Sequence, residues 1–237
     1  MKVLGKIWRL FCRTLLELPC PVCGTLTCAN DNSLCAECAG SLVTVPEPQC
    51  PGCGGPVDGI LAQCSECLAA GVRPWRQAKA VFLYKGAARE LILQLKFHRH
   101  TETAPLLAAY AAGVLNQFPD RFDYIVPVPL HWLRYLQRGY NQSSLVAAEL
   151  SKLSGIPVLN ALKRVKYGGH QARRKRQARL QAMRGSFKLR KNMDLSGKTV
   201  LLLDDVFTTG ATLSAAAVAL QFGHPQDIDV LSLGRRL

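Results

Sequence analysis

Long apolar runs are missing from this sequence of 237 residues. Although 49% of the residues are hydrophobic, enough to fill a core, no run approaches the roughly 18–20 residues that cross a membrane. Charged residues interrupt residues 1–18, which therefore lack the apolar centre of a secretory signal. We expect this stretch to form a basic amphipathic helix that packs on its own protein, with binding to a membrane surface as the alternative. A cytoplasmic location follows as an expectation.

Charges of one sign are missing from two long segments. Residues 19–70 contain Asp and Glu but no Lys or Arg, so this segment is a poor phosphate binder and favours a structural or protein-contact role. Residues 163–191 contain twelve Lys and Arg residues and no Asp or Glu, and carry most of the net charge of +14. This basic segment suits a lid that brings cations to a bound anion, contact with a nucleic-acid backbone, or simply a solvated surface.

The cysteine pattern favours metal over disulfides. Eight of the 10 cysteines form four C-x-x-C pairs in the first third of the chain, and without a secretory signal this pattern indicates zinc in a reducing compartment. Four thiolates complete a closed tetrahedral site, so we expect two structural Zn²⁺ ions. In the simplest arrangement, sequential pairing, the first two pairs hold one ion and the last two pairs hold the other. A cross-braced arrangement, in which the pairs alternate between the ions, stays open. The expected ligands are Cys20, Cys23, Cys35, Cys38, Cys50, Cys53, Cys64 and Cys67.

Residues 199–213 combine a predicted strand, an acidic pair, a Thr- and Gly-rich loop and the start of a helix. We expect Asp204 and Asp205 where the strand ends, and the helix from about Thr212. The loop between a strand end and a helix start suits a small anion such as phosphate. It is not a Walker loop, because it lacks the sequence Gly-Lys-Ser/Thr. The carboxylates would accept hydrogen bonds from hydroxyls, which indicates a sugar phosphate such as ribose 5-phosphate. The expected phosphate ligands are Thr208, Thr209, Gly210, Ala211 and Thr212.

A second strand, expected over residues 124–128, is followed by the polar stretch PLHWLRYLQRGYNQ. Arg134 and Arg138 in this predicted loop suit a diphosphate, which guanidinium groups bind bidentately, while surface arginines are the alternative. Asn141 is a favoured N-cap and predicts a helix over about residues 142–153.

The remaining elements predict the fold class. We expect strands over residues 80–84 and 227–233 and helices over residues 87–97 and from about 103, with the basic cluster LKFHRH as a solvated turn. Alternating strands and helices predict an α/β domain with a mostly parallel sheet, preceded by a zinc-ribbon-like module. The expected divisions are a basic helix over residues 1–18, a double zinc-ribbon-like module over 19–72 and the α/β domain over 73–237.

The stretch VLLLDDVFTTGATL resembles the phosphoribosyl diphosphate (PRPP) motif of type I phosphoribosyltransferases. Over nearly its whole length the chain also resembles the ComF family, which includes the GntX proteins. The cysteine pairs, YKG followed by LILQLKF, VPVPL followed by RGYNQ, and the PRPP-like stretch carry this resemblance. The chain departs from the family at Tyr140, where Phe is usual, and at Met183, where Asn is common, so no catalytic role follows for position 183.

The resemblance implies a type I phosphoribosyltransferase fold and a PRPP site, with Mg²⁺ bridging the diphosphate and the ribose. Asp204 and Asp205 would hold the ribose, the following loop would hold the 5-phosphate, and Arg134 and Arg138 would neutralise the diphosphate. Asp204, Asp205 and Arg138 are the catalytic candidates.

The resemblance also implies a role in the uptake and use of external DNA, with single-stranded DNA and DNA-uptake proteins as partners. Two alternatives stay open. One is an inactive scaffold that binds single-stranded DNA through the basic segment, and the other is an active phosphoribosyltransferase of nucleotide salvage with an unknown acceptor. The residues expected to contact DNA are Arg173, Arg174, Lys175, Arg176 and Arg179.

Overall fold

The computed structural model describes residues 18–27, 34–166 and 185–237. The basic helix expected over residues 1–18 lies outside these ranges except for its last residue, and so do the arginines and the lysine expected to contact DNA. Within the described ranges no helix is long and apolar enough to cross a membrane.

A parallel sheet with strand order β3-β8-β7-β4 forms the centre of the fold. Successive side chains of a strand point to opposite faces, so Val200 and Leu202 join the core on one face and Leu201 and Leu203 join the core on the other. Burial on both faces explains the continuous apolar run of this strand. The strands are β3 (Ala78–Leu83), β4 (Tyr124–Pro127), β7 (Thr199–Phe207) and β8 (Asp227–Arg235).

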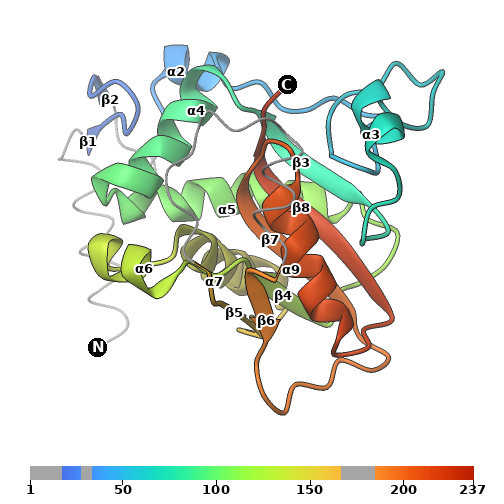
Figure 1. The fold of residues 1–237 in the computed structure, drawn as a ribbon. Coiled ribbons are helices and arrows are strands. Elements are labelled where there is room, and N and C mark those ends of the chain that lie inside the picture. The colour runs from blue at the N-terminus through green and yellow to red at the C-terminus, as the bar shows by residue number, and fades with distance from the viewer. Residues whose placement is uncertain (1–17, 28–33, 167–184) are drawn as a thin grey trace.

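Helices cover both faces of the sheet (Figure 1). Leu91, Leu107 and Leu150, from three different helices, pack on one face, while Leu213 and Leu220 of a fourth helix pack on the other. The three are α4 (Gly86–Leu93), α5 (Ala104–Leu115) and α7 (Gln142–Ser154), and the fourth is α9 (Ala211–Gln221). The π-helix η1 (Gln94–His98) continues α4, and the 3₁₀-helix η2 (Thr101–Thr103) precedes α5. The predicted mixed α/β class with a mostly parallel sheet is confirmed.

The cysteine-rich segments pack against the α/β part at two places. Near the first pairs, β1 (Leu18–Pro19) is antiparallel to β2 (Leu26–Thr27), and α2 (Ala36–Gly40) lies against α4. Near the last pairs, α3 (Ser65–Ala70) leads back toward β3. The turn at Gly54 touches the sheet so closely that a Cβ there would lie 2.6 Å from the Lys79 carbonyl carbon. The second half of the module therefore shares the sheet's core.

Two local expectations were wrong. Strand β7 does not end at Leu203 but continues through the acidic pair to Phe207, because its pairing with β8 continues to Arg235. Residues 129–139 are not a loop, since they contain α6 (Trp132–Arg138), which His131 caps by accepting a hydrogen bond from the Leu133 N–H at 3.3 Å. Near the two ends of the basic segment, β5 (Leu162–Arg164) pairs antiparallel with β6 (Phe187–Leu189).

Candidate functional site

Two buried carboxylates lie where β7 passes the amino end of α7. Asp204 and Asp205 are only 8% and 6% exposed. Asp204 Oδ1 accepts hydrogen bonds from the Ser143 hydroxyl at 3.3 Å and from the Asp205 N–H at 2.9 Å. Asp205 Oδ2 lies 2.9 Å from Lys96 Nζ and accepts a hydrogen bond from Gln142 Nε2 at 2.5 Å. The two acids therefore have different partners.

These partners give the two carboxylates different charges. Burial, reinforced by the negative charge of Asp205, raises the pKa of Asp204 to about 7. Burial opposes ionisation of Asp205 as well, but the charge and hydrogen bonds of Lys96 and Gln142 outweigh it and lower the pKa of Asp205. At neutral pH Asp205 is ionised and Asp204 is partly protonated, so a cation that binds beside Asp204 would favour loss of its proton.

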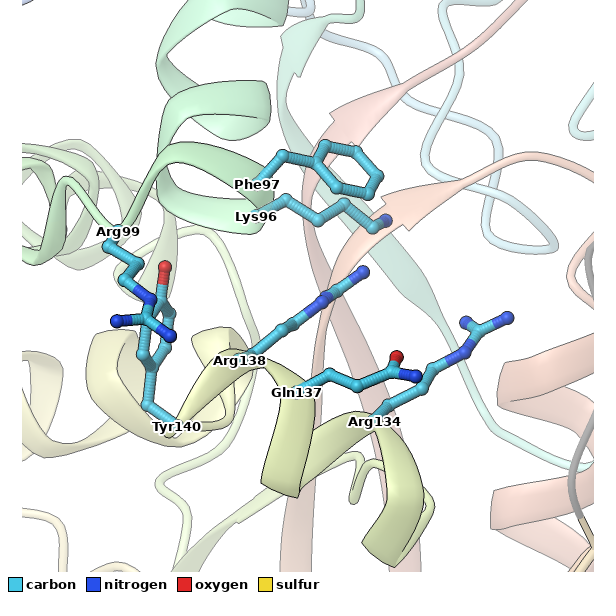
Figure 2. A pocket seen from close by; sticks show the side chains of 7 residues that line it. All are labelled: Lys96, Phe97, Arg99, Arg134, Gln137, Arg138 and Tyr140. Carbon is cyan, nitrogen blue, oxygen red and sulfur yellow. The ribbon is translucent and has the colours of Figure 1, made fainter.

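A basic pocket of about 230 Å³ adjoins this pair, and Lys96 belongs to both. Lys96 and Phe97 reach into the pocket from η1 on one side, and Arg134, Gln137 and Arg138 reach into it from α6 on the other (Figure 2). The Arg138 guanidinium lies 5.0 Å from the centre of the Phe97 ring and donates to Gln142 Oε1 at 3.0 Å. The pocket therefore collects positive charge suited to an anion with more than one negative group.

The Thr- and Gly-rich loop joins β7 to α9 beside the acid pair. Gly210, with φ +76°, is the N-cap of α9 and offers no side chain to accept from the first N–H groups of the helix. Thr209 Oγ1 accepts a weak hydrogen bond from the Ala211 N–H at 3.4 Å. The amino end of α9 therefore presents N–H groups and a positive dipole to an external acceptor.

Comparison with known proteins identifies the family. No family model matches the chain. It is 30% identical to the competence protein ComFC of Bacillus subtilis (strain 168) over 196 residues, which cover 80% of this chain and 78% of that protein. It is also 30% identical to the DNA utilization protein YhgH of Escherichia coli (strain K12) over 234 residues, which cover 94% of this chain and all of that protein. The chain belongs to the ComF family.

Other relatives of this ComF-family protein include competence protein F of Haemophilus influenzae, 31% identical over 213 residues that cover 86% of this chain and 91% of the relative. Two solved structures show a distant likeness. Glutamine PRPP amidotransferase from B. subtilis has a TM-score of 0.41 at 15% identity, over 60% of this chain and 30% of that one. Adenine phosphoribosyltransferase from Saccharomyces cerevisiae has a TM-score of 0.38 at 19% identity, over 59% of this chain and 72% of that one.

The eight paired cysteines of this ComF-family protein form two groups that could each hold a metal ion. In each group all four sulfur atoms lie within 4.8 Å of one another, and the groups are those of sequential pairing. The Cys23 and Cys35 sulfurs are 3.6 Å apart, and those of Cys53 and Cys64 are 3.7 Å apart. Four sulfurs at about 2.3 Å from a tetrahedral ion are separated by about 3.8 Å, so both groups fit such an ion.

Sequence reasoning missed several residues of the site. Lys96 was expected in a solvated turn, which was wrong, because it follows the buried Ile92 by four residues and extends the buried side of its helix toward Asp205. That spacing was the available signal. Arg235 lies past the expected end of the last strand at residue 233, but in the structure it is buried in β8.

Arg235 connects the loop to the second cysteine group. Its Nη1 donates to the Thr208 carbonyl at 3.3 Å, and its Nη2 lies 3.2 Å from Glu66 Oε2. Its guanidinium also stacks 5.1 Å from the centre of the Phe207 ring. No local pattern marks Arg235, because these partners come from distant parts of the chain.

Proposed function

We propose that this ComF-family protein binds PRPP. The observation that carries the proposal is that the basic pocket adjoins the buried acid pair through Lys96, while the loop that caps α9 follows the pair along β7. A sugar with a phosphate at one end and a diphosphate at the other has the matching order of groups. The 5-phosphate would occupy the loop of residues 208–212, the ribose hydroxyls would bind Asp204 and Asp205, and the diphosphate would lie beside Arg134 and Arg138.

Carboxylate oxygens suit Mg²⁺, so Asp204 would help to hold this ion, which would supply positive charge to neutralise the diphosphate. Asp204 is partly protonated and can give up its proton when Mg²⁺ binds. Asp205, in contrast, is already paired with Lys96. The two cysteine groups would hold zinc as closed structural sites, since four thiolates leave no open position for catalysis.

The same contacts would favour transfer of the phosphoribosyl group if an acceptor bound. The bond from the anomeric carbon to the diphosphate oxygen would break, with both electrons leaving on the diphosphate. Asp204 and Asp205 would stabilise the developing cationic sugar, and Arg134 and Arg138 would stabilise the leaving group. The new bond would form from an electron pair of the acceptor.

Calorimetric titration with PRPP and Mg²⁺ tests the proposal, on protein shown by metal analysis to carry two zinc ions per chain. We expect wild-type protein to bind and the Asp204→Asn/Asp205→Asn variant to bind about a hundredfold more weakly, because two charged hydrogen-bond acceptors are lost. Asp194→Asn is the matched control, since this carboxylate accepts hydrogen bonds from Ser196 at a loop before β7 and should leave affinity unchanged. Absence of binding by folded, zinc-loaded wild-type protein contradicts the proposal.

A second candidate function, binding of single-stranded DNA, is favoured by one groove. This groove of about 610 Å³ is lined by Trp132 and Tyr135, both exposed, and by Lys163, Arg164 and Arg190 at the base of the β5–β6 pair. Aromatic rings beside cations form the usual platform for stacked bases and their phosphates. The basic residues 173–179 continue the chain between β5 and β6. The names of the relatives, which refer to competence and DNA utilization, agree with this function.

Fluorescence anisotropy with a labelled single-stranded oligonucleotide tests this candidate. We expect affinity to fall steeply with salt, and neutralising Arg173, Arg174, Lys175 and Arg176 to reduce the slope of the logarithmic salt plot by up to about 3. Trp132→Ala should weaken binding by about 1–3 kcal/mol. Phe222→Ala, which removes an exposed ring from the far end of α9, is the control. If affinity changes neither with salt nor in Trp132→Ala, the groove is not the binding site for single-stranded DNA.

A further inference from the structure

Arg73 lies in the segment between α3 and β3 and reaches the Thr- and Gly-rich loop. Its guanidinium carbon is 5.5 Å from the centre of the Trp75 ring and 5.9 Å from that of Phe207, and these two rings meet edge-on at 6.2 Å. Its Nη2 donates to Cys67 Sγ at 3.8 Å. Two aromatic rings and one cysteine of the second metal group thus fix the direction of this side chain.

The other terminal nitrogen of Arg73 lies against the loop. A Cβ placed on Gly210 would be 3.2 Å from Arg73 Nη1, so this nitrogen is beside the N-cap of α9. Glycine at this position allows the close approach. The guanidinium of Arg73 and the first N–H groups of α9 therefore border the same small volume.

The charge of Arg73 has no carboxylate partner within the described residues. Arg235, which also contacts the loop, pairs with Glu66, whereas no carboxylate of residues 18–27, 34–166 or 185–237 forms an ion pair with Arg73. The anionic neighbour of Arg73 is the Cys67 sulfur, one of the four that would hold the second zinc ion, and only Nη2 contacts it. Nη1 lies instead against the loop, where the amino end of α9 adds about half a positive charge. A guanidinium nitrogen beside a helix N-terminus favours binding of an anion there.

We infer that Arg73 is a further ligand of the 5-phosphate, contributed by the cysteine-rich half of the molecule. The inference rests on the proposed PRPP function and extends it. The site then recognises a phosphate monoester by backbone N–H groups, by loop hydroxyls and by one guanidinium that Cys67 positions. The second cysteine group thereby affects ligand affinity as well as folding.

The test compares two partial ligands, ribose 5-phosphate and inorganic pyrophosphate, together with PRPP itself, by calorimetry on the zinc-loaded full chain. We expect Arg73→Gln to weaken binding of ribose 5-phosphate and PRPP about tenfold, because one charged hydrogen bond is lost. Pyrophosphate, which would lie beside Arg134 and Arg138, should bind as in wild-type protein. Arg73→Lys should recover part of the loss, since it keeps the charge but not the planar fork. Arg89→Gln, on the exposed side of α4, is the control.

The outcomes separate this inference from the proposed function. If wild-type protein binds PRPP and Arg73→Gln binds ribose 5-phosphate equally well, Arg73 is not a phosphate ligand and the PRPP site stands. If Arg73→Gln weakens pyrophosphate as much as ribose 5-phosphate, Arg73 only supports the fold and the inference fails. If wild-type protein binds none of the three ligands, the proposed function fails and the inference fails with it.

Discussion

Replacing Lys96 by methionine is expected to lower the free energy of unfolding by about 3 kcal/mol, because it leaves Asp205 buried without its cation. The value lies at the low end for a broken buried pair, since 24% of the Lys96 side chain is exposed. Denaturant unfolding of the zinc-loaded protein measures the loss. Lys152→Met is the matched control, because Lys152 is 69% exposed and its pair with Glu149 is worth less than about 1 kcal/mol.

The loss in Lys96→Met should also depend on pH. In wild-type protein the pKa of Asp205 is lowered, so its ionised form stabilises the fold above the unfolded pKa, and this contribution disappears only in acid. Without Lys96, burial raises that pKa above its unfolded value, so stability should fall as pH rises above about 4, the unfolded pKa of Asp, and should level off above the folded pKa. Lys96→Met/Asp205→Asn should recover most of the stability. A double variant as unstable as the single one would mean that Lys96 acts through packing and not through its charge.

Replacing Gly210 by alanine is expected to weaken PRPP binding at least about tenfold and to lower the free energy of unfolding by about 1–3 kcal/mol. Gly210 has φ +76°, and a Cβ there would lie 2.7 Å from Phe207 Cζ and 3.2 Å from Arg73 Nη1. The ring and the loop would have to separate, which displaces the N–H groups proposed to bind the phosphate. Calorimetry and denaturant unfolding measure the two effects.

The matched control for this change is Gly155→Ala. Gly155 has φ +74° at the end of α7, and no atom lies within 4 Å of the position its Cβ would take. Gly155→Ala therefore has the same cost of placing an alanine at positive φ, but it makes no close contact and leaves the Thr- and Gly-rich loop unchanged. If Gly210→Ala binds PRPP like wild-type protein and loses no more stability than Gly155→Ala, the loop does not hold the phosphate.

Elements that depend on neighbouring residues could be predicted from the sequence. The apolar run before Asp204, the Thr- and Gly-rich loop before α9 and the helix capped by Asn141 are all local patterns, and the structure has each of them. The cysteine groups could be predicted because metal ligands occur at characteristic spacings. The assignment of PRPP and DNA contacts to particular residues stays a prediction.

Contacts between distant residues could not be predicted in the same way. Lys96 and Asp205 are 109 positions apart, and nothing near either residue indicates their pairing. The extension of β7 past its acids depends on pairing with β8, which is a property of the sheet and not of the segment. Arg73 reaches the loop because the second cysteine group packs on that sheet, and Arg235 reaches it because β8 pairs with β7.

The position of β8 in the middle of the sheet has a consequence for biosynthesis. It is the last strand of this sheet to be translated, yet it lies between β3, the first strand of the sheet, and β7. One edge of β3 pairs with residues 43–45, which are translated earlier, but its other edge has no partner until β8 leaves the ribosome. Such late, long-range closure makes folding slow and exposes strand edges to aggregation. We therefore expect the nascent chain to depend on chaperones more than its length suggests.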